Sequence, residues 1–140
     1  TMYIVNKGNK LSLIDIDHNP LLTTNYDFFK LLNRGMLYAK AKSQPVLINC
    51  EGEVITSDRY KEITVFYNKD LINRYFVTSH YGKIGLINEE GKELIPPIYD
   101  SLDPMSQHKY IFATRAGAKE FFDYDGKAIS FDNLKKYAGQ

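Results

Sequence analysis

A stretch from Gly82 to Leu102 recurs along the chain, and this recurrence limits what the chain can fold into. It contains short apolar runs separated by turn residues at Glu90-Gly91 and Pro96-Pro97. Three further segments match it: 9–29, 43–63 and 117–137. Successive copies therefore start 34, 39 and 35 residues apart. Because two strands are not stable alone, each copy must pack against neighbours of its own kind, and the fixed period predicts a repeat array.

Two positions carry most of the match. An apolar pair recurs at Leu13-Ile14, Leu47-Ile48, Leu86-Ile87 and Phe121-Phe122. A tyrosine follows at Tyr26, Tyr60 and Tyr99, with Leu134 at this position in the last copy. We interpret the tyrosine as a packing residue between repeats whose hydroxyl, or the Asp that follows it at Asp27 and Asp100, bonds turn backbone. A repeated ligand site is the alternative.

Each copy has the pattern of a hairpin followed by a third extended segment. The sequence therefore predicts an all-β fold, an array of four β-hairpin-based repeats in one domain over 1–140. The array is expected to be an open curved or solenoid-like sheet, with a small closed β-propeller as the alternative. The predicted units are 2–32, 35–67, 74–105 and 109–140.

Several local features follow from this register. We expect 27–33 to be extended although part of it has helical spacing, and 67–73 to form an expanded loop. Pro45 belongs at a strand start or on an edge, and Pro96-Pro97 is expected to force a bend. The last unit is polar and atypical, as a terminal cap requires.

The best-matching copy resembles a known family. Residues 82–88 read Gly-Lys-Ile-Gly-Leu-Ile-Asn, and residues 91–100 read Gly-Lys-Glu-Leu-Ile-Pro-Pro-Ile-Tyr-Asp. This resembles the bacterial WG-repeat family, whose unit reads G-K-W-G-L-I-D and then G-K-E-V-I-P-P-x-Y-D. Residues 34–39 resemble the segment that leads into that family's next unit. The family's tryptophan is Ile84 here and the chain has no Trp, so a ligand-stacking indole is not carried over.

Composition argues against several classes of protein. The 18 Lys and Arg nearly balance the 17 Asp and Glu, which argues against a nucleic-acid binder driven by a basic surface. Cys50 is the single cysteine, so no intramolecular disulfide can form. The sequence has no apolar run long enough to span a bilayer and no signal-peptide pattern. We therefore expect a cytoplasmic protein that binds neither membrane nor nucleic acid.

Catalytic and metal-binding patterns are missing from the sequence. His18, His80 and His108 share no metal-type spacing. The segments 15–17 and 123–126 resemble fragments of a calcium loop, but the remaining ligand positions are missing, so we interpret them as turns. There is no phosphate loop, nucleophile elbow or Ser-x-x-Lys pair. We predict no enzymatic activity, no metal site and no cofactor.

The remaining candidate for function is the surface, because repeat arrays usually bind other macromolecules. Tyrosines and acidic residues in or beside turns are the predicted partner-binding residues: Asp58, Glu62, Tyr67, Asp70, Tyr81, Glu89, Glu90, Asp123, Tyr124 and Asp125. The resemblance implies a cytoplasmic immunity protein that blocks a bacterial toxin domain, encoded nearby, by covering its active site. A ligand- or glycan-binding module at the cell envelope is the alternative. The sequence leaves the oligomeric state open.

Overall fold

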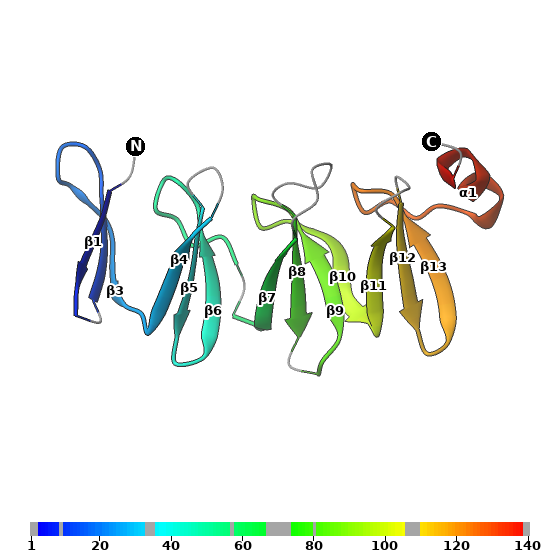
Figure 1. Cartoon of the computed structure of the whole chain (residues 1–140), viewed down its shortest axis with the longest axis horizontal. Coiled ribbons are helices and arrows are strands. Elements are labelled where there is room, and N and C mark those ends of the chain that lie inside the picture. The colour runs from blue at the N-terminus through cyan, green and yellow to red at the C-terminus, as the bar shows by residue number, and fades with distance from the viewer. Residues whose placement is uncertain are drawn as a thin grey trace. The chain divides into compact units, whose positions relative to one another are not determined.

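The structure is a computed structural model that describes residues 3–8, 10–32, 36–56, 58–66, 74–79, 81–105 and 110–138. Within these residues the chain forms strands β1 to β13 and one helix, α1 (Figure 1). The strands build four small antiparallel sheets, none of them closed, so the predicted all-β repeat architecture is confirmed. The expanded loop expected at 67–73 lies outside the described residues.

The chain divides into two compact units, 1–62 and 63–140. The prediction of a single domain stays a prediction. The first unit contains a sheet of order β1-β2-β3 and a sheet of order β4-β5-β6. Its strands are β1 (Tyr3–Lys7), β2 (Lys10–Ile14), β3 (Pro20–Asn25), β4 (Phe28–Leu31), β5 (Leu37–Ala41) and β6 (Gln44–Ile48). The run 27–33 is therefore extended at β4, as predicted.

The second unit holds the other two sheets, of order β10-β9-β8-β7 and β11-β12-β13. Its elements are β8 (Arg74–Ser79), β9 (Ile84–Ile87), β10 (Glu93–Tyr99), β11 (Ser101–Met105), β12 (Tyr110–Arg115), β13 (Ala118–Phe122) and α1 (Phe131–Ala138). The boundary between the units falls within β7 (Tyr60–Phe66).

A hydrophobic core lies between the two sheets of each unit. In the first unit it consists of Leu13, Leu37, Ala39 and Ile48, all of them fully buried. In the second unit it consists of Leu86, Ile95, Tyr99, Ile111, Ala113 and Phe122. Because neighbouring residues on a strand point to opposite faces, the apolar pair of each repeat supplies one side chain to each face of its sheet. The recurring pair found in the sequence is therefore what lets every sheet pack against another.

The same turn follows the second strand of every repeat. Asn88 Oδ1 accepts hydrogen bonds from the backbone N–H groups of Glu90 at 3.0 Å and Lys92 at 2.9 Å, and Gly91 has a φ of 83°. Asp15, Asn49 and Asp123 make the equivalent pair of bonds. The left-handed position of Gly91 is taken by His18, Gly52 and Gly126. These turns recur at the predicted intervals, so the same two hydrogen bonds mark the same position in every repeat.

The Tyr-Asp corner connects one sheet to the next. Asp27 Oδ2 accepts a hydrogen bond from Lys42 N–H at 2.8 Å, and Asp100 Oδ2 accepts one from Ala116 N–H at 2.9 Å. Both donors lie in the hairpin of the following sheet. Tyr99 is buried in the core of its unit. These contacts are the structural role that the sequence predicted for the recurring Tyr-Asp pair.

The two proline sites behave differently. Pro45 lies in β6, the edge strand of its sheet, as predicted. Pro96 and Pro97 do not form a turn, because both lie inside β10, but the strand is irregular there, as the expected extended bend requires. The pairing of β10 with β9 shifts register on both sides of Ile95. A Cβ on Gly85 would lie 2.5 Å from Ile95 O and 2.7 Å from Pro97 N, so a glycine on β9 permits this close approach.

The third segment is not a strand in every repeat. In the second and fourth repeats it is reduced to single bridges, Ile48 with Val54 and Phe122 with Ala128. The fourth repeat then ends in α1, which the sequence analysis did not predict. Ser130 begins this helix, because its Oγ accepts a hydrogen bond from Asn133 N–H at 3.3 Å. A local capping residue therefore overrides the repeat pattern at this point.

The first prediction concerns the turn acceptor. Replacing Asn88 by Ala leaves two turn N–H groups without their acceptor, and we expect the free energy of unfolding to fall by about 1 kcal/mol. Asn88→Asp keeps the oxygen that Asp15 and Asp123 supply at the same place and is expected to change stability far less. Urea unfolding of both variants measures the difference, and equal losses would contradict the assignment.

The second prediction compares two glycines with similar backbone angles. Gly126 has a φ of 87°, and a Cβ there would lie 2.1 Å from Leu94 O. Gly82 has a φ of 75°, and a Cβ there would meet nothing within 4 Å. Both Ala variants carry the strain of positive φ, about 1 kcal/mol, but Gly126→Ala must also displace backbone. We expect Gly126→Ala to lower the thermal midpoint clearly more than Gly82→Ala does.

Candidate functional site

The structure separates the predicted partner-binding residues of the third repeat. Tyr81 lies in the hairpin between β8 and β9 and is 91% exposed. Glu89 and Glu90 lie in the turn between β9 and β10. Because these turns are at opposite ends of β9, Tyr81 and the two glutamates do not form one surface patch.

The predicted residues of the fourth repeat have different roles. Asp123 is the turn acceptor, since its Oδ1 accepts hydrogen bonds from Asp125 and Lys127 N–H groups. Tyr124 packs against the core of the second unit. Asp125 is exposed. Of these three, Asp125 has the side chain that is best placed to meet a partner.

Glu62 belongs to a part-buried polar group in the first unit. Its carboxylate accepts hydrogen bonds from Tyr38 Oη at 2.7 Å and Lys40 Nζ at 2.8 Å. Burial, and then the Glu62 carboxylate, raise the pKa of Tyr38 to about 12. Glu62, the last residue of the first unit, is therefore held to β5 through its side chain. Asp58 is exposed, and Tyr67 and Asp70 lie outside the described residues.

A repeated acidic position was only half recognised from the sequence. The third residue of the recurring turn is exposed and carries a carboxylate in every repeat: Asp17, Glu51, Glu90 and Asp125. The predicted set contained Glu90 and Asp125 but not the other two. The repeat register could have found them, because all four lie two residues after the turn acceptor.

These carboxylates are not used to build the turn. The turn depends on the acceptor side chain and on backbone groups. Among the described residues, the side chains of Asp17, Glu90 and Asp125 form no ion pair. The remaining carboxylate of the set, Glu51, has a like-charged neighbour in Glu53. A hydrogen bond with the Glu53 carboxylate, and then its charge, raise the pKa of Glu51. The turn ends of the sheets therefore carry negative charge that is open to solvent.

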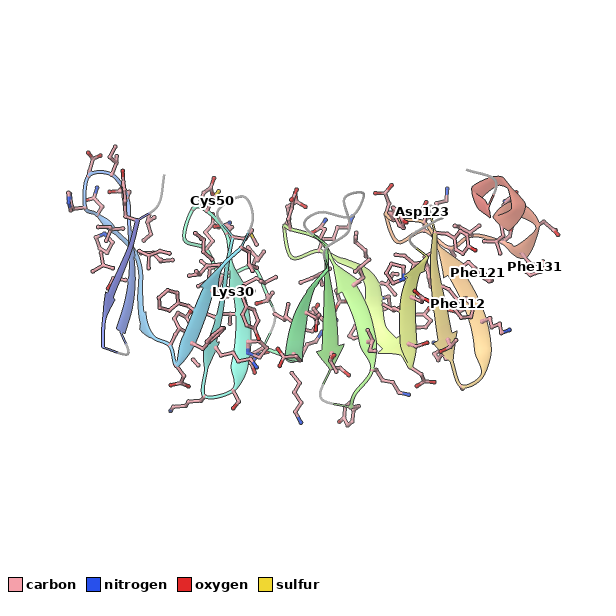
Figure 2. All side chains as sticks on the ribbon, in the orientation of Figure 1. Lys30, Cys50, Phe112, Phe121, Asp123 and Phe131 are labelled. Atoms are coloured by element: carbon pink, nitrogen blue, oxygen red, sulfur yellow. The ribbon has the colours of Figure 1, made fainter. Side chains whose placement is uncertain are left out.

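A pocket of about 420 Å³ lies beside β13 in the second unit. Figure 2 shows the side chains of Phe121 and Phe131 near β13 and the start of α1. The wall is largely aromatic and aliphatic, with one cationic and one acidic side chain. Its lining residues are Tyr99, Lys119, Glu120, Phe121, Phe122, Ala128, Ile129 and Phe131. The sequence analysis did not find this pocket, because it depends on where α1 leaves the sheet.

A polar group borders this pocket at Tyr99. Burial, and then the neighbouring Glu120 carboxylate, raise the pKa of Tyr99 to about 12. Arg115 lies with its Cζ 5.6 Å from the centre of the Tyr99 ring, and its Nη2 is 3.7 Å from Glu120 Oε1. The Glu120 carboxylate therefore faces both a cation and a neutral phenol.

The part of the chain that the structure describes contains no group of three His, Cys, Asp or Glu side chains placed to hold a metal ion. It contains no helix long and apolar enough to cross a membrane.

Comparison with known proteins gives a family for part of the chain. Residues 84–113 match the family described as WG containing repeat. These residues form a WG-containing repeat that extends from β9 to β12, as the resemblance in the sequence indicated. No curated protein sequence matches the chain.

One solved structure shares a distant likeness with the chain. The crystal structure of BamB from Moraxella catarrhalis is similar over 92% of this chain, with 17% sequence identity and a TM-score of 0.37. The chain spans 44% of the length of that protein.

The third prediction concerns the pKa of Tyr99. Because the folded-state pKa lies above the ordinary value of 10.0, the stability that the buried neutral phenol contributes is present below pH 10 and is lost as the pH rises towards 12. Glu120→Gln removes the carboxylate, which is the smaller of the two causes of the raised pKa. The pKa of Tyr99 should therefore fall but stay above 10.0. NMR titration of ring-labelled tyrosines measures this, with Tyr99→Phe for assignment. An unchanged Tyr99 pKa, or an equal fall at Tyr38, would contradict the assignment.

Proposed function

We propose that this chain is a non-enzymatic protein-binding module, a cytoplasmic immunity protein that neutralises a cognate bacterial toxin by direct binding. The observation that carries the proposal is the exposed carboxylate at the same turn position of every repeat: Asp17, Glu51, Glu90 and Asp125. Residues repeated in register on a scaffold are the usual means by which repeat proteins recognise a partner.

Turn chemistry alone does not account for these acids. Asp and Asn favour turns because their short side chains bond nearby backbone, and here that role belongs to the residue two positions earlier. Glu has no such preference, yet it stands at Glu51 and Glu90. Asp and Glu are 17 of the 140 residues, so composition alone does not place an acid at this position four times. The acids are therefore better explained by contact with a partner.

The charge pattern fits a partner with a basic surface. Negative side chains at the ends of rigid turns attract a positive surface over long range and mainly increase the association rate. A toxin domain whose active-site surface is basic is such a partner, and a scaffold placed over that surface blocks substrate access. Inhibition of this kind requires shape and charge but no chemistry from the immunity protein.

A glycan-binding module at the cell envelope is the second candidate. The aromatic wall of the pocket beside β13, with Phe121 and Phe131, supports this candidate. Aromatic rings with a few polar groups at the rim suit the apolar faces of a sugar ring.

The fourth prediction tests the acidic turns. The tagged chain should capture the product of an adjacent toxin gene from the native strain. The triple variant Asp17→Asn, Glu90→Gln, Asp125→Asn should slow association by about tenfold at low salt and weaken its dependence on salt. The control Asp27→Asn, Asp103→Asn, Asp132→Asn changes the net charge equally at exposed positions outside the predicted partner-binding set.

Surface plasmon resonance at several salt concentrations distinguishes the outcomes. The control variant should associate within about twofold of the unmodified chain. Equal losses in both variants would show that net charge, not the turn position, matters. Capture of a glycan with no protein partner would favour the second candidate.

A further inference from the structure

Two members of the recurring apolar pair are less buried than the other six. Neighbouring residues on a strand point to opposite faces, so each pair places one side chain on each face of its sheet. Ile14 in the first sheet and Phe121 in the last sheet of the chain order are only partly buried. The other six members are buried, none of them more than 8% exposed: Leu13, Leu47, Ile48, Leu86, Ile87 and Phe122.

The first sheet has an apolar face that points away from its core. Ile4 and Leu13 lie opposite each other on β1 and β2 and pack in the core of the first unit. The residues on either side of this pair therefore point to the other face. Two of them are large apolar side chains that face solvent, with Tyr3 46% and Val5 44% exposed. We call this surface the leading face, and it consists of Tyr3, Val5, Ser12 and Ile14.

The last sheet has an aromatic face that also points away from its core. Ile111 and Phe122 lie opposite each other on β12 and β13 and pack in the core of the second unit. The neighbouring pair, Phe112 and Phe121, points to the other face, where the two ring centroids are 5.4 Å apart (Figure 2). The Tyr110 ring lies 5.8 Å from the Phe121 ring. We call this surface the trailing face, and it consists of Tyr110, Phe112 and Phe121.

The chain itself shows what covers a face of each kind. In the first unit, Leu13 is the first member of its pair and shares a core with Ile48, the second member of the next pair. In the second unit, Leu86 and Phe122 share a core in the same way. Phe121 on the trailing face is a first member, and Ile14 on the leading face is a second member. The trailing and leading faces are therefore the two halves of a contact that the chain already makes twice.

We propose that the trailing face of one copy of the chain packs against the leading face of a second copy, which continues the contact between repeats from one molecule to the next. The contact is heterologous, because the two copies contribute different surfaces, and it generates a ring or an open filament. Burial of the exposed apolar side chains and aromatic rings supplies the driving force. The inference goes beyond the proposed function, because it uses neither the acidic turns nor a toxin.

The fifth prediction compares two valines of similar exposure. Val5 lies on the leading face and is 44% exposed, whereas Val54 lies outside both faces and is 46% exposed. Sedimentation velocity of the unmodified chain should show self-association that increases with concentration. Val5→Lys places a charge without a partner in the contact and should weaken self-association by about tenfold or more. The matched control Val54→Lys should stay within about twofold of the unmodified chain.

A second variant tests whether the two faces meet each other. Phe112→Lys blocks the trailing face, and the long side chain can lie along the sheet with its charge in solvent. Val5→Lys and Phe112→Lys should each stay monomeric where the unmodified chain associates. Their mixture contains one intact pair of faces and should form a heterodimer and nothing larger. Amide NMR spectra show whether Phe112→Lys folds, and if it does not, the two valine variants decide the proposal.

Several outcomes would overturn this assignment. One is an unmodified chain that is monomeric at every concentration, and another is equal weakening in Val5→Lys and Val54→Lys. Folded single-face variants that form no heterodimer would show that like faces meet. Loss of toxin capture by Val5→Lys, with an unmodified chain that stays monomeric, would assign the leading face to the toxin. Capture through the acidic turns does not require self-association, so the proposed function is judged separately by its own variants.

Discussion

One side-chain oxygen per repeat holds this fold in register. At the end of each second strand, an Asp or Asn accepts hydrogen bonds from two backbone N–H groups and closes the same turn. These donors would otherwise have to find water or another partner, and an unmet polar group is costly. The turn is the same whether a full third strand follows it or only a bridge. Strand pairing is therefore the variable part of the repeat, and the turn is the constant part.

The features that the sequence predicted correctly are those that local residues determine. Asn88 and Gly91 specify their turn within five residues, and the pair Leu86-Ile87 specifies two buried faces. Features that depend on distant partners were missed. The prolines remain inside β10 because Gly85 on another strand lets the backbone approach, and α1 forms because Ser130 caps it where a strand was expected.

The residues of the candidate site show the same difference between features that local residues determine and features that depend on distant partners. The sequence found Glu90 and Asp125 as acidic turn residues, and the register would also have found Asp17 and Glu51. It could not show that Asp123 is used as the turn acceptor and Tyr124 for packing, because both roles require coordinates. Nor could it show that the third segment of the fourth repeat is reduced to a single bridge, since this depends on where α1 begins.

The alternation of third strands gives the chain a second, longer period. Repeats with a full third strand and repeats with a single bridge follow each other, and each compact unit contains one of each kind. A full third strand therefore follows the turns at Asp15 and Asn88, only a single bridge follows those at Asn49 and Asp123, and the structural module is a pair of repeats. Duplicating this pair as a unit keeps the alternation of third strands and bridges, whereas copying one repeat in place would put two repeats of the same kind next to each other in the sequence.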